Sequence, residues 1–359
     1  MTEQKNIPAP NPPIIGITLG DLNGIGPEIV IKALEDSRFS KLFTPVIYGN
    51  HKLINRYKKL LGSEDFQIQP CRTAATAASR KINMLNCWEQ DYEIKPGELD
   101  PEAGKLAWEG LKKAAQDLKN GEIQALVTGP INKSNMPKDE FPYPGHTEFF
   151  AELAGVKESL MVMVSEHLKV ALATVHLPLE KVASKLNRNL IFNRISELEK
   201  TLFKDFMVRF PKIAVLGLNP HAGENGKMGI EEETVIGPAI KDLREKGKHV
   251  YGPFPADGFF ASGQFSKFDG ILAMYHDQGL IPFKVLAGYG GVNYSAGLPF
   301  IRVSPDHGTG FDIAGKNEAN PDSLRNAIFL ALDIIRNRED SSIELKTGKS
   351  SVQSSGGAD

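Results

Sequence analysis

The chain has 359 residues, of which 41% are hydrophobic and 24% charged, and a formal net charge of −2 at pH 7. This composition is typical of an ordinary globular protein, and a chain of this length usually forms two domains. A nearly neutral chain has no electrostatic footprint for nucleic acid or for an anionic membrane surface, so we expect neither as a partner.

The cysteine content and the ends of the chain indicate a cytoplasmic protein. Cys71 and Cys87 are too few and too far apart for a metal-type pair, which favours a reducing compartment. No stretch approaches the roughly 18 apolar residues of a membrane span, and the first residues lack the apolar core of a signal peptide. Residues 1–13 are rich in proline and residues 348–359 in serine and glycine, so we expect both to be flexible tails.

Strand-like and helix-like segments alternate along the chain. Apolar, β-branched runs occupy residues 13–18, 45–48, 125–128, 160–164, 170–175, 213–218 and 270–274. Helical patterns cover residues 27–34, 104–118, 147–153, 232–243 and 321–336. This alternation predicts an α/β fold with a largely parallel sheet.

A glycine-rich loop follows the first strand-like run. From Gly20 to Glu28 it reads Gly-Asp-Leu-Asn-Gly-Ile-Gly-Pro-Glu, with Pro27 where the first turn of a helix accepts proline. Such a loop either brings the backbone close to a ligand or is simply a sharp strand-to-helix connection, and the residues favour neither. Glycines at positions 20, 24 and 26 do not have the spacing Gly-x-Gly-x-x-Gly, so a Rossmann domain is not indicated.

Two further loops have features of anion sites. Residues 128–134, Thr-Gly-Pro-Ile-Asn-Lys-Ser, combine small residues with a cation and a hydroxyl, although many such loops are only turns. In Pro-Gly-His-Thr-Glu-Phe-Phe, Thr147 is a candidate N-cap and His146 stands just before it, at a helix end whose N–H groups attract anions. A capping threonine beside an incidental histidine is the alternative.

Three histidines each follow a strand-like run. His176 lies in Thr-Val-His-Leu-Pro, His221 in Asn-Pro-His-Ala-Gly-Glu and His276 in Tyr-His-Asp-Gln-Gly. Neutral imidazole is the commonest ligand for zinc-like ions, and three protein ligands leave one coordination position for a substrate. In open α/β folds, ligands bind where strands end. Structural histidines are the alternative, because the wide spacing forms no local ligand motif.

The segment between residues 252 and 315 holds the densest set of polar residues among glycines and apolar residues. Lys284, Asn293 and Arg302 are suited to binding an anionic substrate. Asp257 and Asp277 are candidates for supporting a metal-bound histidine or for transferring a proton, because ligating histidines commonly donate to carboxylates. Each residue alone has the alternative of being a surface group, but together they favour a site.

A set of short strings occurs in a fixed order: Gly-Asp-x-x-Gly-Ile-Gly-Pro-Glu, Val-Thr-Gly-Pro-Ile-Asn-Lys, Gly-His-Thr-Glu-Phe, Asn-Pro-His-Ala-Gly-Glu, Gly-Pro-x-Pro-Ala-Asp, Met-Tyr-His-Asp-Gln-Gly, Gly-Val-Asn and Ser-x-Asp-His-Gly-Thr. Together they resemble the 4-hydroxythreonine-4-phosphate dehydrogenase family of pyridoxal phosphate biosynthesis. The resemblance spans about residues 14–335. No single string is decisive, but the ordered set is specific.

The resemblance implies an isocitrate/isopropylmalate dehydrogenase-like fold with two α/β domains around a deep inter-domain cleft. We expect residues 14–140 and 305–345 to form the first domain and residues 141–304 the second, which carries most site residues. The family is homodimeric with its active site at the subunit interface. His176, His221 and His276 match its metal ligands and need not all come from one chain. His146, Thr147, Lys284, Asn293 and Arg302 match its substrate-binding residues.

The implied reaction oxidises the secondary alcohol of 4-phosphooxy-L-threonine with NAD or NADP and then removes carbon dioxide, giving 3-amino-2-oxopropyl phosphate. A divalent ion such as zinc, magnesium or cobalt would assist both steps. The cofactor-binding residues are not apparent from the sequence.

Departures from the family pattern leave the substrate open. Leu22-Asn23 stands where many members have Pro-Ala, and Gly290 where many have an arginine. Relatives with the same histidines act on threonate or erythronate 4-phosphate, which is the main alternative, or on aromatic dihydrodiols. Less favoured alternatives are an isocitrate-type oxidative decarboxylase, which would hold its metal with aspartates, a phosphate acyltransferase of this fold, and a non-catalytic phosphometabolite-binding protein.

Overall fold

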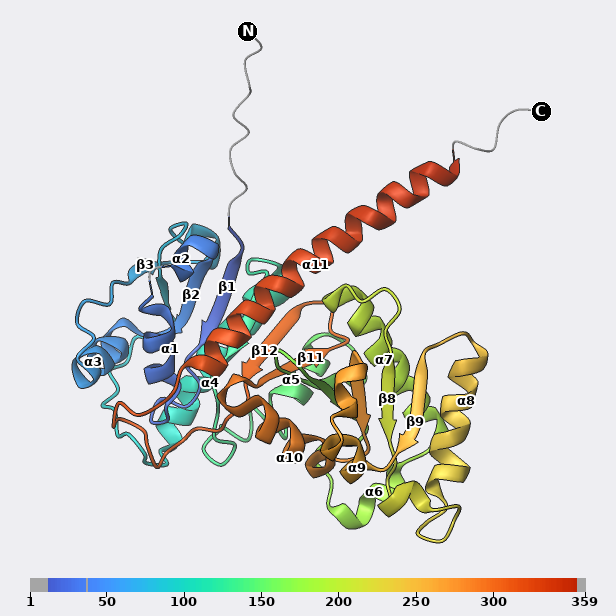
Figure 1. Cartoon of the computed structure of the whole chain (residues 1–359). Coiled ribbons are helices and arrows are strands. Elements are labelled where there is room, and N and C mark those ends of the chain that lie inside the picture. The colour runs from blue at the N-terminus through green and yellow to red at the C-terminus, as the bar shows by residue number, and fades with distance from the viewer. Residues whose placement is uncertain (1–11, 37, 354–359) are drawn as a thin grey trace. The chain divides into compact units, whose positions relative to one another are not determined.

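The computed structural model describes residues 12–36 and 38–353 (Figure 1). The chain divides into two compact units, one of residues 1–142 with 308–321 and one of residues 143–307 with 322–359. Each unit contains alternating strands and helices, which confirms the α/β class predicted from the sequence.

The first unit is a parallel sheet with helices. Its strands are β1 (Ile14–Thr18), β2 (Thr44–Gly49), β3 (Gln69–Cys71), β4 (Asn83–Asn86) and β5 (Ala125–Thr128), and its helices are α1 (Gly26–Leu34), α2 (Phe39–Leu42), α3 (His51–Leu61) and α4 (Pro101–Asn120). Neighbouring strands are parallel in the order β3-β4-β2-β1-β5. Strands β2 and β5 are buried along their whole length, as expected for parallel strands covered on both faces.

The second unit has a mixed sheet. Its strands are β6 (Leu160–Val164), β7 (Lys169–Leu172), β8 (Ile213–Leu216), β9 (Val250–Phe254), β10 (Gly270–Ala273), β11 (Val292–Ala296) and β12 (Ile301–Pro305). Its α-helices are α5 (His146–Leu153), α6 (Val182–Lys185), α7 (Arg188–Phe206), α8 (Gly237–Glu245), α9 (Ala256–Ala261), α10 (His276–Ala287) and α11 (Asp322–Gln353). The strand order is β12-β11-β6-β7-β10-β8-β9.

The prediction of a largely parallel sheet is correct for the first unit and for β7-β10-β8-β9, but wrong for the other end of the second unit. There β12, β11, β6 and β7 pair antiparallel. Two of these three pairs, β6 with β7 and β11 with β12, are joined by short connections. Strands joined so tightly form hairpins, whereas a parallel crossover needs a dozen or more residues.

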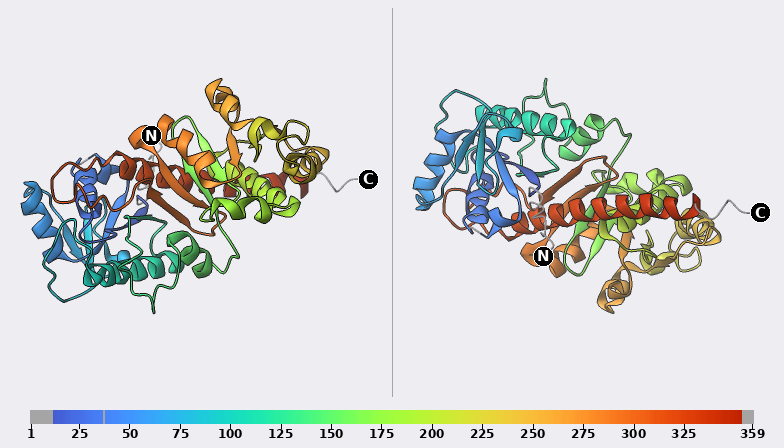
Figure 2. Two further views of the ribbon diagram at one scale, coloured as in Figure 1. Left: turned by 90° about the horizontal axis from the view of Figure 1, so that it is seen from below. Right: turned by 90° about the horizontal axis from the view of Figure 1, so that it is seen from above.

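Helices cover both faces of the second sheet. A side chain on Gly270 would meet Leu198 and Leu202 of α7, whereas its neighbour Ile271 belongs to the core cluster that includes Phe283 of α10. Because successive strand residues point to opposite faces, α7 and α10 lie on opposite sides of β10. The long α11, red in Figures 1 and 2, packs beside α7 and on β11 and β12.

The division into units differs from the expected one in its C-terminal part. Of residues 305–345, only residues 308–321 belong with the first unit, where Ile25 N donates to Thr309 O at 2.8 Å and Ala319 N donates to Glu28 Oε1 at 2.8 Å. Helix α11 instead packs on the second unit. The boundary therefore follows hydrogen bonds that the sequence does not reveal.

The expected flexible tails fall largely outside the described residues, which exclude 1–11 and 354–359. Residues 348–353, however, continue α11 to Gln353 and are helical rather than loose. Extending an existing helix costs little compared with starting one, which accounts for this difference. Among the described helices none is long and apolar enough to cross a membrane.

A buried ion pair joins α7 to α11 within the second unit. Arg338 Nε donates to Asp205 Oδ1 at 2.7 Å, and Tyr294 OH donates to Asp205 Oδ2 at 2.6 Å. Asp205 is 3% exposed. Removing one partner from such a pair leaves an uncompensated buried charge.

We expect Arg338→Ala to lower the free energy of unfolding by about 3–5 kcal/mol, because Asp205 would stay buried without its cation. Arg336→Ala, whose side chain is 71% exposed in its ion pair with Asp333, is the matched control and should change stability by less than about 0.5 kcal/mol. Urea unfolding of the full chain measures both. Equal effects of the two substitutions would contradict the importance of the buried pair.

Candidate active site

Strands β7, β10 and β8 are adjacent and parallel, and their paired residues end at nearly the same level. The chain leaving each carboxyl end carries one expected metal ligand. His176 follows β7, His276 is the first residue of α10, and His221 lies in η3 (Pro220–Gly223) beyond β8. The topology thus places all three histidines beyond adjacent strand ends, in keeping with their expected positions.

His176 and His276 lie close together, with ring centroids 6.3 Å apart. His276 Nδ1 lies 2.7 Å from Asp277 Oδ1, and His176 Nδ1 lies 3.7 Å from Glu148 Oε1. An imidazole whose Nδ1 faces a carboxylate presents Nε2 as the basic nitrogen, which is the arrangement typical of metal-ligating histidines. The pair is therefore suited to binding a divalent cation.

Glu148 is a site residue that sequence reasoning missed. Its carboxylate lies near His176 and also acts electrostatically on the guanidinium of Arg302. The string Gly-His-Thr-Glu-Phe contains this glutamate, but a glutamate in the first turn of a helix is usually explained by the helix dipole. Only the structure shows that it connects a histidine with a buried cation.

His221 is held in an unusual backbone conformation. His221, Ala222, Glu224 and Asn225 have φ angles of 52°, 49°, 42° and 53°, in the left-handed region. This conformation costs non-glycine residues about 1–2 kcal/mol each. Such strain persists only where the surroundings enforce it, and it is concentrated at functional sites.

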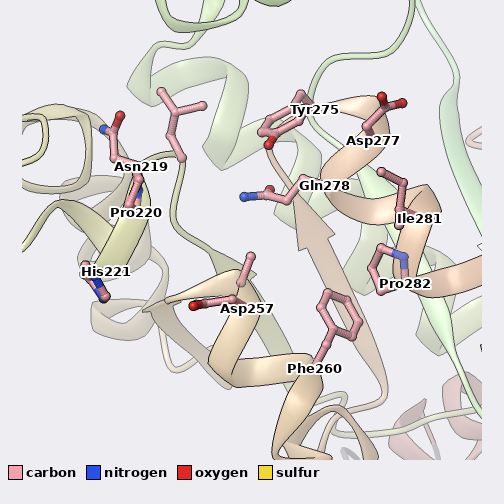
Figure 3. A pocket seen from close by; sticks show the side chains of 12 residues that line it. Asn219, Pro220, His221, Asp257, Phe260, Tyr275, Asp277, Gln278, Ile281 and Pro282 are labelled. Carbon is pink, nitrogen blue, oxygen red and sulfur yellow. The ribbon is translucent and has the colours of Figure 1, made fainter.

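Within the described residues, His221 does not complete a metal site with the other two histidines, because no group of three or more His, Cys, Asp or Glu side chains there is placed to hold a metal ion. His221 instead lines a cavity of about 550 Å³ together with Asp257 and Asp277 (Figure 3). In Figure 3 its ring points away from Asp277. The three-histidine site, including its sharing between subunits, remains a prediction.

The two expected supporting carboxylates start neighbouring helices. Asp277 lies in the first turn of α10 and contacts His276, as expected for a carboxylate that supports a ligating imidazole. Asp257 lies in the first turn of α9 and lines the same cavity. A part in proton transfer remains a prediction for both.

Helix α5 carries two of the expected substrate-binding residues. It begins at His146, and its N-cap is Gly145, so the expected capping role of Thr147 is wrong. Gly145 is fully extended, which ends the preceding turn early and places Thr147 inside the first helical turn. Thr147 instead lines a second cavity of about 520 Å³ with Glu148. First-turn residues lie beside N–H groups that attract anions.

Arg302 on β12 is only 2% exposed. Its Nη1 donates to Ser295 Oγ at 3.1 Å, and its guanidinium lies 5.6 Å from the ring centre of Phe150. Burial lowers the pKa of Arg302 to about 9, and the carboxylate of Glu148 offsets only part of that effect. Arg302 is thus a buried cation that lies beside the hydroxyl of Ser295, the ring of Phe150 and the charge of Glu148.

Asn293 and Lys284 provide further polar groups. Asn293 pairs with Ser304 across β11 and β12, so side-chain alternation places Asn293 and Arg302 on one face of the hairpin. Within the described part of the chain, Asn293 Oδ1 is buried and has no hydrogen-bond partner, so it can accept a hydrogen bond from a ligand. Lys284 Nζ lies 3.1 Å from Asp306 Oδ1. Burial raises the pKa of Asp306, and Lys284 opposes that shift.

The glycine-rich loops of the first unit pack on each other. Asp21 N donates to Pro130 O at 2.8 Å, and Asn135 Nδ2 donates to Asp21 Oδ2 at 2.7 Å. A side chain at Gly20 would place its Cβ 2.2 Å from Pro130 O. Asp21 is buried, which raises its pKa. These contacts favour a structural connection over a loop that approaches a ligand.

The second unit thus has an α/β architecture, with imidazoles beyond adjacent strand ends and a buried cation. These features are suited to binding an anionic substrate. A family model described as "Pyridoxal phosphate biosynthetic protein PdxA" matches residues 41–331. The chain belongs to this family, which confirms the resemblance found in the sequence.

The relatives include dehydrogenases of two substrates. The chain is 45% identical over 327 residues to a 4-hydroxythreonine-4-phosphate dehydrogenase of Bacteroides thetaiotaomicron, covering 90% of this chain and 89% of that protein. It is 39% identical over 324 residues to a D-threonate 4-phosphate dehydrogenase of Pectobacterium atrosepticum, covering 89% and 99%. A crystal structure of 4-hydroxythreonine-4-phosphate dehydrogenase from Klebsiella pneumoniae matches with a TM-score of 0.77 and 37% identity, covering 90% and 98%. The chain is therefore an enzyme of a dehydrogenase family.

We expect Arg302→Met to lower the free energy of unfolding by about 1–3 kcal/mol, because the buried hydroxyl of Ser295 loses a hydrogen-bond partner. Inorganic phosphate at about 100 times its dissociation constant should stabilise the wild-type protein by about 2.7 kcal/mol, and should not stabilise the variant. Thermal unfolding with and without phosphate measures both effects. Arg336→Met is the exposed control. A destabilised variant that phosphate still stabilises as much as the wild type would assign Arg302 to the fold alone.

Proposed function

We propose that this chain oxidises 4-phosphooxy-L-threonine with NAD or NADP and decarboxylates the product to 3-amino-2-oxopropyl phosphate, within pyridoxal 5'-phosphate biosynthesis. The observation that carries the proposal is the pair His176 and His276, each with a carboxylate near Nδ1, in a unit that also buries Arg302. Membership of the family and 45% identity to a dehydrogenase named for this type of substrate support it.

His176, His221 and His276 would hold a divalent ion, with zinc, magnesium and cobalt as candidates. The donor set fits, because two of the imidazoles lie close together and have carboxylates placed to leave Nε2 available. When bound, the ion lowers the pKa of the substrate hydroxyl and polarises the ketone formed from it. A bound nicotinamide cofactor would supply the acceptor for the hydride.

The polar side chains bind the anionic groups of the substrate. Arg302 and Lys284 match phosphate and carboxylate in charge, and His146 and Thr147 contribute from the start of α5. The buried oxygen of Asn293 accepts a hydrogen bond from a substrate donor. Together these contacts hold the substrate so that the carbon that gives up hydride has a fixed position relative to the histidines.

Carboxylates near the histidines are the candidates for proton transfer. The substrate hydroxyl loses a proton as its carbon loses hydride, and the carbon that releases carbon dioxide gains a proton. Asp257 and Asp277 line the cavity that also includes His221, so both are candidates for these transfers.

Oxidation of threonate 4-phosphate or erythronate 4-phosphate is the second candidate function. The 39% identity to D-threonate 4-phosphate dehydrogenase of Pectobacterium atrosepticum favours it. These substrates keep the phosphate and carboxylate but replace the ammonium group with a hydroxyl, so the same cations serve both. A phosphate acyltransferase is less favoured, because it has no use for the paired histidines.

We expect NAD reduction and carbon dioxide release with 4-phosphooxy-L-threonine, a lower kcat/KM with threonate and erythronate 4-phosphates, and loss of activity after chelation that zinc, magnesium or cobalt restores. Spectrophotometry and carbon dioxide capture measure the two products. Faster turnover of threonate or erythronate 4-phosphate would select the second function. Activity on none of the three, or activity untouched by chelation, would contradict both.

The metal site also supports a homodimer with shared active sites. Within the described residues no three candidate ligand side chains are grouped to hold a metal ion, so a partner subunit can provide the missing ligand. Helix α10 exposes apolar side chains, with Ile281 61% and Val285 79% accessible, just after His276. An exposed apolar face of this kind is typical of a subunit interface.

We expect His221→Ala and His276→Ala each to abolish activity while leaving the unfolding temperature nearly unchanged, since neither ring is buried in the core. A mixture of the two variants should regain about a quarter of wild-type activity after subunit exchange, because half of the dimers are hybrids with one intact shared site. Rates at several mixing ratios measure this complementation. If all three ligands belonged to one chain, no mixture would be active.

The remaining parts of the proposal concern location and partners. Cys71 and Cys87 are both free, which supports the cytoplasmic location. Burial raises the pKa of the Cys71 thiol to about 11 and that of Cys87 to about 12, so neither is a reactive thiolate at neutral pH. The proposed partners are a small phosphorylated substrate and a second copy of this chain, without nucleic acid or membrane.

A further inference from the structure

The turn that carries His221 depends on contacts from outside itself. Residues 221–226 all have positive φ angles, four of them without the freedom of glycine. A left-handed run of this kind is not favoured by its own backbone. Its position must therefore be enforced by neighbouring groups.

Glu232 provides such contacts from the first position of the π-helical turn η4 (Glu232–Ile236). Its Oε1 accepts hydrogen bonds from Leu218 N and Asn219 N, both at 2.7 Å, and its Oε2 accepts one from Asn219 Nδ2 at 2.9 Å. Glu232 is only 4% exposed. A buried carboxylate with several N–H donors is firmly fixed, because charge-assisted hydrogen bonds are strong and their loss is costly.

The same carboxylate lies against the strained turn. A Cβ at Gly223 would lie 2.7 Å from Glu232 Oε2, so the turn can approach this closely only with glycine there. Gly223 also has a φ of 83°. Glu232 thus contacts the chain on both sides of His221.

Gln278 holds Gly217, the residue before Leu218, by a hydrogen bond. Its Nε2 donates to Gly217 O at 2.6 Å, and its Oε1 accepts from Met274 N at 2.7 Å. Gln278 belongs to α10, the helix that begins with His276. The backbone that leads to His221 is therefore fixed to the element that carries another expected ligand.

We propose that Glu232 is a positioning residue for metal binding: through Leu218 and Asn219 it holds the backbone of the turn so that His221 is presented to the divalent ion. The inference rests on the proposed function, since it requires His221 to be a metal ligand. In this proposal Glu232 acts through its hydrogen bonds to Leu218 and Asn219 and is not itself a metal ligand.

The test uses the full-length protein with Glu232→Gln and Glu232→Ala. Glu233→Gln, an exposed neighbour in the same helical turn, is the matched control. Zinc affinity is measured by competition with a chelator, and amide hydrogen exchange is followed across residues 217–226. Glutamine keeps one oxygen acceptor, so it tests the role even if the alanine variant folds poorly.

We expect zinc affinity to fall about 10–100-fold in Glu232→Ala, less in Glu232→Gln, and not at all in the control. Exchange should accelerate at Leu218 and Asn219 but remain at wild-type rates in the β7 and β10 strands. Wild-type affinity and exchange in both Glu232 variants would overturn the inference. Faster exchange throughout the second unit would also overturn it, because it would reveal a general structural role.

His221→Ala separates this inference from the proposed function. If His221→Ala binds zinc as tightly as the wild type, the proposed metal site is wrong and the inference falls with it. If His221→Ala loses zinc affinity while the Glu232 variants keep it, the metal site stands and the positioning role alone is wrong.

Discussion

The parallel pairing of β7, β10 and β8 is the constraint on which the candidate site depends. Parallel neighbours must end at the same edge, so residues far apart in sequence leave the sheet beside one another. His176 and His276 come within 6.3 Å, centroid to centroid, for this reason and without any local motif. The antiparallel hairpin β11–β12 continues the same unit and turns Asn293 and Arg302 toward one face.

Carboxylates lie beside the histidines, beside the backbone that leads to His221 and near Arg302. Glu148 and Asp277 lie near the Nδ1 atoms of two histidines, and Glu232 acts on the backbone before the third. Glu148 also offsets part of the burial cost of Arg302. Negative charges inside the second unit thus lie beside two of the histidines, the backbone before the third and the buried cation.

Much of this arrangement could be predicted from the sequence, because strand-like runs followed by His, Pro and Gly mark strand ends whatever their tertiary partners. The runs at residues 170–175, 213–218 and 270–274 led to the three histidines in this way. Strands β11 and β12 were missed, since they lie among glycines and polar residues. Helix α10 was missed because it starts at His276 itself and contains Pro282, which weakens the helical pattern.

The glutamates could not be predicted for a different reason: burial of a charged side chain is a tertiary property. Glu232 stands among Glu231 and Glu233, and a run of glutamates before a helical segment indicates a solvated helix start. Helix α7, by contrast, has a start signal in its sequence. Asn187 caps the helix because its side chain accepts a hydrogen bond from Leu190 N, and an asparagine at this position could have predicted the helix start.

The three histidines also differ in how firmly the fold holds them. His276 is fixed by the start of a helix and by Asp277, and His176 lies a few residues beyond the largely buried strand β7. His221 lies in a left-handed turn whose conformation opposes its own backbone preference. A metal site loses affinity when any one of its ligands must be ordered upon binding, since that entropy is subtracted from the binding free energy. In the proposed metal site, the least regular of the three elements would therefore be the one whose supporting contacts determine how tightly the ion is held.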